Sequence, residues 1–368
     1  MLLVKAPRDN ILAPLQSVCG IVEKRHTLPI LSNVLIEKDG EFLTLLTTDI
    51  EIQIRTQAAG AAGTEKTAVT VSARKLQDIL RSLPDGLDVS LETSDKRMQV
   101  RAGKSRFSLQ TLPAEDYPRM APGGEQQVEL KLTQKQFKRL LGLVQYAMAQ
   151  QDIRYYLNGL LLVVTGDELR AVATDGHRLA FASERLAETQ PRCEVILPRK
   201  AVLELSRLLA DNDDAVDISL ASSQARFRFG GVELVSKLID GKFPEYERVI
   251  PQNHNKLVSV PRITLLQSLH RAAILTNEKF RGVRLVLAPG SLKIISSNTD
   301  QEEAQEEIEI DYDAEAIDIG FNVTYLLDVL NNVSNDSIEV RLADANSSAL
   351  ITLPGNDSFK YVVMPMRI

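Results

Sequence analysis

The stretch ATDGHRLAF, residues 173–181, places an aspartate, a glycine, a histidine and an arginine at four consecutive positions. A carboxylate next to an imidazole is a pair that enzymes use for general acid–base catalysis. The chain has only four histidines, so this one invites an active-site interpretation. Covalent catalysis would also need an activated nucleophile close by, and no recognisable one accompanies Asp175 and His177. The sequence therefore disfavours catalysis here, and it predicts no catalytic residue.

Other chemical motifs are weak. The AGKS at 102–105 resembles the end of a phosphate-binding loop, but the glycine required five positions before Gly103 is Met98, so a hairpin turn is favoured. The four histidines lack metal-ligand spacing, and the two cysteines are isolated. The acidic run at 300–307 is compatible with a divalent-metal site, but a charged surface facing solvent or a partner is favoured. We therefore expect no metal and no cofactor.

Length and composition set the class of protein. At 368 residues the chain is too long for one ordinary core, so two or three domains are expected. Its 44% hydrophobic and 25% charged residues are typical of a soluble globular protein. The N-terminus lacks the apolar region of a signal peptide, and Cys19 and Cys193 fit a reducing compartment, so a cytoplasmic location is expected. The net charge of −6 argues, at face value, against a nucleic-acid partner.

Three features recur in the same order, which indicates an internal repeat. A strand pattern runs into an acidic turn at Asp49, Asp175 and Asp300, which are 126 and then 125 residues apart. A helix-like segment and a closing strand pattern that ends at a proline follow each turn. Asp175 is therefore expected to form a turn of the repeated scaffold. His177 and Arg178 have no counterpart in the other repeats, so they are candidates for a binding feature added to one copy.

The elements of each repeat follow from hydrophobic periodicity. One helical stripe is predicted within residues 133–148 from apolar residues at helical spacing, namely Phe137, Leu140, Leu141, Val144 and Met148. Ile50, Ile52 and Ile54 alternate with polar residues, which is the period of a half-buried strand. Each repeat is thus predicted to be an α+β domain with two helices packed on antiparallel strands. Polar stretches place the domains at 1–126, 127–254 and 255–368.

Charge is sorted between the elements. The six predicted helices together carry +9, which leaves −15 on the rest of the chain. One interpretation is ordinary amphipathic surface. The other is a basic, helix-lined face for a phosphate backbone, in which contacts to phosphates hold DNA without reading its sequence.

Long strings in this sequence resemble those of the beta sliding clamp family, the processivity subunits of bacterial DNA polymerase III. They include VSARKLQDILRSLPDG, QDIRYYLNG, VATDGHRLA, SKLIDGKFPEYERVIP and the terminal YVVMPMRI, in the expected order along the whole chain. The resemblance implies three tandem clamp domains of like fold. It further implies a head-to-tail homodimer that forms a six-domain ring around DNA, with helices lining the hole.

The resemblance also implies three sets of site residues. The set expected to contact double-stranded DNA, independently of sequence, comprises Arg25, Arg74, Gln151, Tyr155, Tyr156, Lys200, Phe280 and Arg284. The dimer interface is expected to join apolar and basic residues of the first domain to apolar and acidic residues of the partner's third domain. These residues are Lys75, Ile79, Lys104, Arg106, Phe107 and Leu109 on one side, and Ile274, Leu275, Asp300, Glu302, Glu303 and Glu306 on the other.

The third set forms a peptide pocket between the second and third domains. It comprises Arg154, Tyr156, Leu157, Thr174, Gly176, His177, Arg178, Leu179, Pro244, Arg248, Val249, Ser348, Val362, Val363, Met364, Pro365, Met366 and Arg367. An apolar groove with adaptable methionines suits varied partner side chains, and His177 and Arg178 are expected to form its polar rim. Core packing is the alternative interpretation of VVMPM.

The expected partners follow from the resemblance. They are DNA, a second copy of the chain, and proteins that dock through short linear motifs: the DNA polymerase III alpha subunit, the clamp loader, other DNA polymerases and repair proteins. No membrane partner is expected, and the location is cytoplasmic, with the nucleoid. Two other functions stay open, a DNA hydrolase that uses Asp175 and His177, and a scaffold that binds proteins only.

Overall fold

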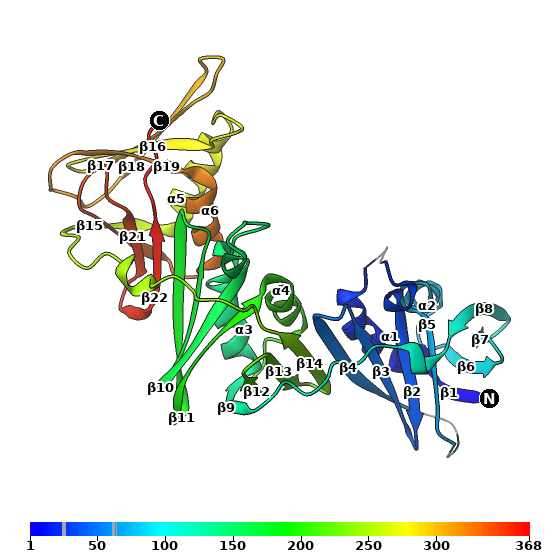
Figure 1. Ribbon diagram of the computed structural model, residues 1–368. Helices are drawn as coiled ribbons and strands as arrows, with labels where there is room; N and C mark the ends of the chain where they lie inside the picture. Colours follow the sequence, from blue (N-terminus) through cyan, green and yellow to red (C-terminus); the bar gives the residue numbers. More distant parts are fainter. Residues whose placement is uncertain (24–26, 61–62, 64) are drawn as a thin grey trace. The chain divides into compact units, whose positions relative to one another are not determined.

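The computed structural model describes residues 1–23, 27–60, 63 and 65–368 (Figure 1). These residues form two compact units. Unit 1 consists of Met1–Lys138 and Leu203–Leu238, and unit 2 consists of Arg139–Val202 and Ile239–Ile368. Each unit therefore contains part of the range 127–254 that the sequence assigned to a second domain.

The described elements follow one order three times, except that in the second repeat the long strands β10 and β11 each take the place of two strands. The first repeat comprises β1 (Leu2–Pro7), α1 (Arg8–Val18), β2 (Asn33–Asp39), β3 (Phe42–Thr48), β4 (Ile52–Ala59), β5 (Thr67–Ser72), α2 (Ala73–Ser82), β6 (Asp88–Ser94), β7 (Arg97–Ala102) and β8 (Ser105–Leu112). The second comprises β9 (Gln126–Thr133), α3 (Gln134–Gly142), β10 (Gly159–Thr174), β11 (Arg178–Pro198), α4 (Arg199–Leu208), β12 (Ala215–Ala221), β13 (Gln224–Phe229) and β14 (Val232–Lys237). The third comprises β15 (Lys256–Pro261), α5 (Arg262–Ala273), β16 (Gly282–Ala288), β17 (Ser291–Ser297), β18 (Glu303–Glu309), β19 (Ile317–Asn322), α6 (Val323–Asn332), β20 (Ser337–Leu342), β21 (Ala349–Leu353) and β22 (Asn356–Val363).

The repeat is visible in the bonding as well as in the order. The first strand of each repeat pairs antiparallel with the strand that follows the second helix: β1 with β6, β9 with β12, and β15 with β20. In each repeat, the first residue of the first helix donates its backbone N–H to a carbonyl just before the strand that follows the second helix. The distance is 2.8 Å in all three repeats. The pairs are Arg8 with Leu87, Gln134 with Asp214, and Arg262 with Asp336. The prediction of three like α+β domains is confirmed.

Adjacent repeats share their sheets through one kind of strand pair. In unit 1, β14 pairs antiparallel with β4, with Ile52 opposite Ser236, inside a sheet of twelve strands. In unit 2, β22 pairs antiparallel with β11, with Arg178 opposite Val363, inside a sheet of six strands. Strands β18, β17, β16 and β19 form a separate sheet of four. The same two strand positions of the repeat therefore meet in both seams.

Two predictions about element boundaries are wrong. The helix within 133–148 ends at Gly142, and a 3-10 turn follows at Gln145–Ala147, although the apolar stripe continues and is buried throughout. Burial of the stripe alone does not require α-helix, because a tighter turn also points side chains inward. Ile50 does not belong to strand β4: its φ is 80°, and it lies in the turn before the strand. The alternation begins at Ile52 instead.

That turn is built by a side-chain oxygen in every repeat. Asp49 Oδ1 accepts hydrogen bonds from the backbone N–H groups of residues 51 and 52, at 3.0 and 2.7 Å. Asp175 Oδ1 accepts from residues 177 and 178, at 2.9 and 3.1 Å. In the third repeat the acceptor is Asn298 Oδ1, with bonds of 3.0 Å to the N–H groups of residues 300 and 302. The scaffold role of Asp175 is confirmed, but Asp300 as the third counterpart is wrong, because the third turn is one residue longer.

We predict that Asn298→Ala lowers the free energy of unfolding by about 1–2 kcal/mol, because two backbone N–H groups lose their acceptor. Asp300→Ala is the matched control and is expected to change the free energy by less than about 0.5 kcal/mol, since its exposed carboxylate takes no part in the turn. Equilibrium unfolding in urea measures both. A larger loss for Asp300→Ala than for Asn298→Ala would contradict this assignment.

Candidate functional site: an apolar cavity at the start of β11

The stretch ATDGHRLAF forms the tight connection between β10 and β11. Thr174 Oγ1 donates to the Arg178 carbonyl at 2.6 Å and accepts from the Gly176 N–H at 3.1 Å. Gly176 has a φ of 91°, which other residues rarely adopt, and a Cβ at this position would lie 3.0 Å from the guanidinium of Arg154. The turn is therefore fixed by its own hydrogen bonds and by a backbone conformation that favours glycine.

A cavity of about 200 Å³ lies beside this turn in unit 2. Its apolar side includes Leu157, Leu179 and Val362, which also belong to a buried core cluster. Twelve of the eighteen residues expected in the peptide pocket line it, namely Arg154, Tyr156, Leu157, Thr174, Gly176, His177, Arg178, Leu179, Pro244, Val249, Val362 and Met364. The structure thus brings together side chains from four separate stretches of the chain.

Six expected residues lie outside the lining: Arg248, Ser348, Val363, Pro365, Met366 and Arg367. Val363 is fully buried, because successive side chains of a strand point to opposite faces and its neighbour Val362 faces the cavity. Sequence reasoning missed one lining residue, Tyr246. It stands between Pro244 and Arg248 in one of the strings that carried the resemblance, so a signal was present.

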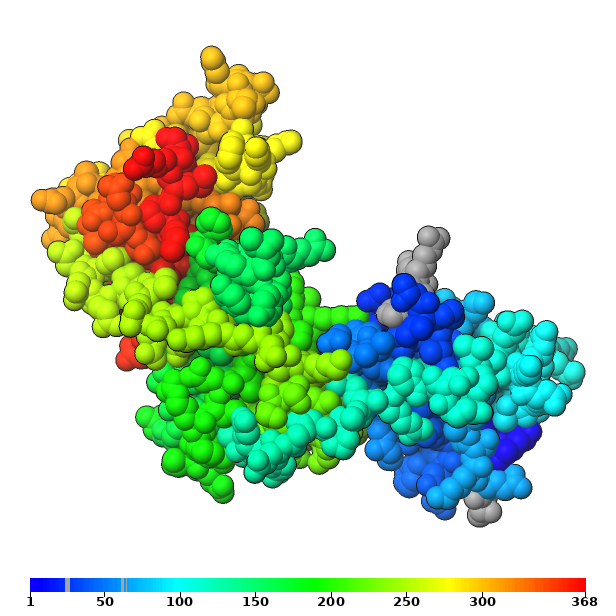
Figure 2. All heavy atoms as spheres, viewed as in Figure 1, coloured from blue at the N-terminus to red at the C-terminus, as the bar shows by residue number. Residues whose placement is uncertain are grey.

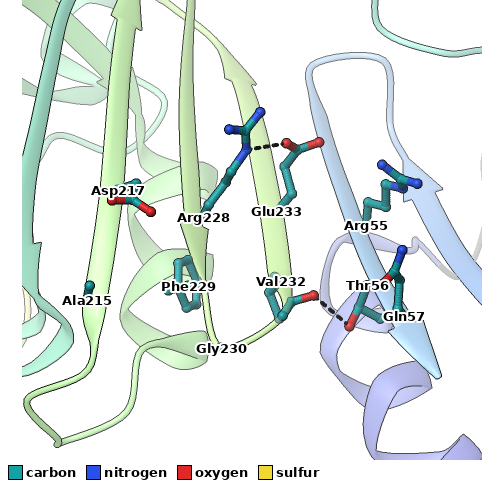
Figure 3. Close-up of a pocket in the computed structure, with 11 residues that line it drawn as sticks. Arg55, Thr56, Gln57, Ala215, Asp217, Arg228, Phe229, Gly230, Val232 and Glu233 are labelled. Atoms are coloured by element: carbon teal, nitrogen blue, oxygen red, sulfur yellow. Dashed lines mark hydrogen bonds and ion pairs between the residues drawn. The ribbon is translucent and has the colours of Figure 1, made fainter. Parts of the chain in front are cut away.

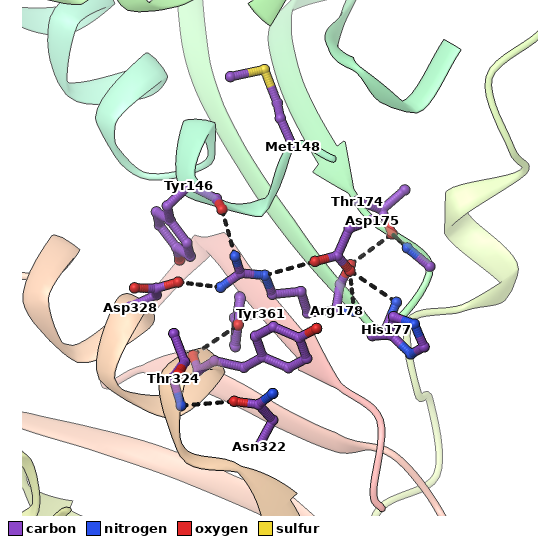
Figure 4. A network of polar contacts seen from close by, with 12 residues as sticks. Tyr146, Met148, Thr174, Asp175, His177, Arg178, Asn322, Thr324, Asp328 and Tyr361 are labelled. Carbon is purple, nitrogen blue, oxygen red and sulfur yellow. Dashed lines mark hydrogen bonds and ion pairs between the residues drawn. The ribbon is translucent and has the colours of Figure 1, made fainter. Parts of the chain in front are cut away.

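Arg178 closes the cavity from inside the protein. Its guanidinium bonds to Asp328 at 2.5 Å and to Asp175 at 3.1 Å, and it donates to the Tyr146 carbonyl at 2.7 Å (Figure 4). It also lies over the Tyr325 ring, 4.5 Å from the centroid. The side chain is only 9% exposed. The expectation that Arg178 belongs to a polar rim is therefore wrong: it is a buried strut between β11 and α6, whereas His177 is exposed.

Burial and charge act together around this strut. Burial opposes the charge of the Arg178 guanidinium, but Tyr361, Asp328 and Asp175 outweigh it and raise its pKa. Burial raises the pKa of the Tyr361 hydroxyl, which donates to the Tyr325 carbonyl at 2.9 Å. The raised pKa values keep Arg178 charged and Tyr361 neutral near neutral pH, so these two groups act as structural elements of the network.

A second arginine frames the outer edge of the cavity. Arg154 bonds bidentately to Asp152, at 3.0 and 2.9 Å, and donates to the Asp175 carbonyl at 3.1 Å. The hydrogen bond from Arg154 is the main reason why the pKa of Asp152 falls to about 2. The Arg154 side chain is 45% exposed, so it offers a polar edge next to an apolar interior.

The arrangement does not support acid–base chemistry at the opening stretch. The Asp175 carboxylate accepts from backbone N–H groups and from Arg178 (Figure 4), while the His177 ring stacks on Tyr325 with 6.5 Å between centroids. Within the described residues, no group of three or more His, Cys, Asp or Glu side chains gathers as a metal site would require. An apolar cavity with a polar edge can instead hold apolar side chains of an extended peptide.

A second, larger cavity of about 370 Å³ lies across the β4–β14 seam of unit 1 (Figure 3). Its lining carries charges of both signs, and Arg228 donates to Glu233 at 2.8 Å. Arg55 and Asp217 add further charges to a lining that also includes the apolar Phe229 and Val232. Sequence reasoning assigned nothing to this groove, and its mixed charge distinguishes it from the apolar cavity of unit 2.

The residues expected at DNA are mostly exposed. Arg74 lies at the start of α2 and donates to the Val22 carbonyl at 2.6 Å. Tyr155 and Phe280 are 56% and 57% exposed. The remaining candidates differ in setting: Gln151 is exposed with a φ of 56°, Tyr156 and Lys200 are half-buried, and Arg284 is paired with Asp318, which raises the pKa of Arg284. Arg25 lies outside the described residues.

The residues expected at the dimer interface differ in how much of each side chain is available. Ile274, just after α5, is 76% exposed, an unusual fraction for an isoleucine. Phe107 and Leu109 on β8 are half-buried, as are Ile79 and Leu275. Exposed charges make up the rest of the set, namely Lys75, Lys104, Arg106, Asp300, Glu302 and Glu303. Glu306 is instead engaged within its own chain, because Arg271 bonds to it at 2.5 and 2.9 Å and lowers its pKa.

Fold and site together define a class: a three-repeat α+β protein with edge strands at its first and third repeats and a cavity of side-chain size. Residues 3–121 match the DNA polymerase III beta subunit, N-terminal domain; residues 131–245 match the central domain; and residues 247–367 match the C-terminal domain. The chain is similar to the beta sliding clamps of Pseudomonas putida, at 48% identity, and Escherichia coli, at 45%, each over 98% of both chains.

Solved structures of sliding clamps share the fold of this chain. The sliding clamp of Pseudomonas aeruginosa bound to griselimycin has a TM-score of 0.96 and 46% identity, and each chain is covered completely. The beta sliding clamp of Caulobacter crescentus has a TM-score of 0.94 and 37% identity over 100% of this chain and 99% of that one. The chain belongs to the DNA polymerase III beta subunit family, the beta sliding clamps. It is thus a processivity factor of DNA replication and not an enzyme, and the hydrolase alternative is wrong.

We predict that Arg178→Met lowers the free energy of unfolding by about 2–3 kcal/mol, because it removes charge-assisted hydrogen bonds and leaves Asp328 without its cation. The matched control is Arg154→Met, which breaks a more exposed ion pair and should cost less than about 1 kcal/mol. Urea unfolding measures both variants. Equal losses for the two would show that Arg178 is not a strut.

Proposed function

We propose that two copies of the chain close head to tail into a ring through β8 of one copy and β18 of the other. The observation that carries this proposal is the repeated seam. Strand β4 pairs with β14, and its counterpart β11 pairs with β22. The third counterpart, β18, pairs with β17 only, among the described residues. Strand β8, the counterpart of β14 and β22, pairs with β7 and meets β5 only at Thr111 and Leu112.

The register of the first internal seam supports a specific contact. Hairpin pairing aligns Arg106 with Glu233, and Gln305 with Arg55. Glu233 faces Arg55 in the first seam, so the same register places Arg106 of one copy opposite Gln305 of the other. Glu303 and Glu307 flank Gln305 on the same strand face. Arg106 on β8, with Lys104 in the turn before it, and the glutamates of β18 favour this heterologous pair over β8 with itself or β18 with itself.

Apolar side chains give the interface its hydrophobic part. Ile274 and Leu275 follow α5, which packs against β18, and Phe107 and Leu109 alternate along β8. An isoleucine that is 76% exposed on one copy gains from burial against the half-buried side chains of the partner. We propose the full interface set named from the sequence, with Glu306 contributing through its Arg271 pair.

The ring accounts for DNA binding by an acidic chain. A closed ring holds duplex DNA topologically, so weak phosphate contacts suffice and sliding is permitted. We propose the DNA-contacting set named from the sequence, including Arg25. Arg284 is expected to contribute least, because Asp318 already neutralises it. The three domains are proposed at 1–126, 127–254 and 255–368, and the ring is proposed to act in the cytoplasm, with the nucleoid.

We also propose that the cavity of about 200 Å³ beside β11 docks short peptide motifs of the DNA polymerase III alpha subunit, the clamp loader, other DNA polymerases and repair proteins. Its size suits side chains, and Met364, 44% exposed, offers an adaptable wall. The sliding clamps of Pseudomonas aeruginosa and Bartonella birtlesii have been solved bound to griselimycin. We propose that griselimycin binds this chain in the same cavity, which makes it a suitable probe.

The ring is tested by the paired substitution Ile274→Ala and Leu275→Ala. We predict that the variant is monomeric at low micromolar concentration, because the apolar part of the interface is lost, and that it is not retained on nicked circular DNA. Analytical ultracentrifugation measures the mass. Gel filtration after loading by a clamp loader measures retention, which for the unaltered chain should be lost when the circle is cut, because open ends release a ring.

Ile263→Ala is the matched control, since Ile263 lies at the start of α5 and is 47% exposed. It should leave both dimer and retention unchanged. A paired variant that stays dimeric would contradict the interface. Retention of the unaltered chain on linear DNA with open ends would contradict the ring.

The cavity is tested by deleting Met364–Ile368. We predict that griselimycin binds the shortened chain at least about tenfold more weakly, because the deletion removes the Met364 wall, while the dimer mass is unchanged. Isothermal titration calorimetry measures the affinity. Unchanged affinity would refute the assignment of the cavity.

A further inference from the structure

The C-terminal segment, residues 364–368, leaves β22 and crosses the surface of the third repeat (Figure 2, red). Two backbone hydrogen bonds hold it. The Met364 N–H donates to the His177 carbonyl at 2.9 Å, and the Met366 N–H donates to the Gly320 carbonyl at 2.8 Å. The first bond reaches the turn beside the cavity, and the second reaches the end of β19. The segment is thus held by one backbone hydrogen bond on each side of Pro365.

Side-chain burial holds this segment only in part. Met364 is 44% exposed and Ile368 is 59% exposed, while Pro365 and Met366 are half-buried. The position of the segment also depends on how closely its backbone can approach the sheet beneath it, because the Met366 N–H bonds directly to the Gly320 carbonyl.

Two glycines on neighbouring strands make that approach feasible. A Cβ on Gly320 of β19 would lie 2.5 Å from the Met366 carbonyl oxygen and 2.8 Å from Ile368 Cδ1. A Cβ on Gly282 of β16 would lie 3.1 Å from Ile368 Cδ1. Neither glycine has a left-handed φ, so backbone conformation does not require glycine at these places. Glycine weakens a strand interior and often marks the close approach of another backbone, which is the situation at Gly320.

We propose that Gly320 and Gly282 form a seat that positions the C-terminal segment, and through it the Met364 wall of the cavity. They are positioning residues, since neither lines the cavity. The inference rests on the proposed peptide-docking function of the cavity. Beyond that function, we infer that Gly320 and Gly282 set part of the affinity of the cavity for a peptide. A docked peptide need not touch either residue.

The test compares three alanine variants of the full-length dimer by calorimetric titration with griselimycin. Gly320→Ala should weaken binding by about tenfold or more, because its Cβ meets a backbone oxygen that cannot move without shifting the segment. Gly282→Ala should weaken binding by about threefold, because its Cβ meets only the tip of a side chain. Gly142→Ala is the matched control and should leave the affinity unchanged, since a Cβ there meets nothing within 4 Å.

A second substitution separates positioning from a general loss of structure. The double variant Gly282→Ala with Ile368→Ala should bind as tightly as the Ile368→Ala single variant, because the three heavy atoms nearest to the new Cβ all belong to the Ile368 side chain. Combined with Gly320→Ala it should not, because the clash with the Met366 carbonyl oxygen persists. Hydrogen exchange at the Met366 amide should be faster in Gly320→Ala than in the unaltered chain. A loss of general stability would produce neither this pattern of rescue nor exchange confined to the segment.

Each outcome bears on a different claim. If the unaltered chain does not bind griselimycin, the proposed function of the cavity fails. If the unaltered chain binds and a folded Gly320→Ala dimer binds equally well, the seat is overturned. Should Gly320→Ala not fold, the Gly282→Ala pair decides: weakening that Ile368→Ala rescues supports the seat, and unchanged affinity refutes it.

Discussion

The antiparallel pairing between β4-type and β14-type strands is the interaction on which the rest of this structure depends. It joins the first and second repeats as β4–β14 and the second and third as β11–β22. Each pairing satisfies a strand edge that would otherwise expose unpaired backbone groups. Because the chain has three repeats and two internal seams, one edge of each kind remains, on β8 and β18. The proposed ring is the arrangement that pairs these last edges without leaving new ones.

The cavity is a product of the same seam. Leu179 and Val362 are opposite each other in the β11–β22 register, and both line the cavity. The next pair is Arg178 with Val363, where the guanidinium turns inward to Asp328 on α6. The seam therefore supplies the apolar interior, and the buried ion pair beside it fixes the two strands to a helix of the third repeat. A binding site arises where two repeats join and needs no separate scaffold.

Comparison of the three turns shows how one scaffold takes different roles. Strand register aligns Ile52, Arg178 and Glu302 at the residue where the turn ends. The backbone of the turn is held in each repeat by a side-chain oxygen, from Asp49, Asp175 or Asn298. With the backbone so fixed, the residue at this position can be apolar in one seam, a buried cation in the next, and an exposed anion on the remaining edge.

The sequence by itself determined the features that depend on local pattern. The spacing of the acidic turns indicated three repeats, the apolar periodicities located helices and strands, and the turn role of Asp175 followed from its place after a strand. Strings shared with the beta sliding clamps indicated the family, and twelve of the expected pocket residues line one cavity. These signals suffice because turns and amphipathic elements are encoded by residues close together in the chain.

Only the tertiary structure decided what lies between distant residues. Arg178 was expected at the rim of the pocket, but its side chain is largely buried against Asp328. Because Asp328 is 150 positions away in the sequence, local pattern could not show this contact. The ion pair between Glu306 and Arg271 of the same chain joins residues 35 positions apart and was not visible in the sequence pattern. Pro365, Met366 and Arg367 were expected to line the cavity together with Met364, yet only Met364 does, and the Met366 N–H bonds to the Gly320 carbonyl. A sequence gives the charge and size of each side chain, but the distance between two side chains far apart in the chain is set only by the folded tertiary structure.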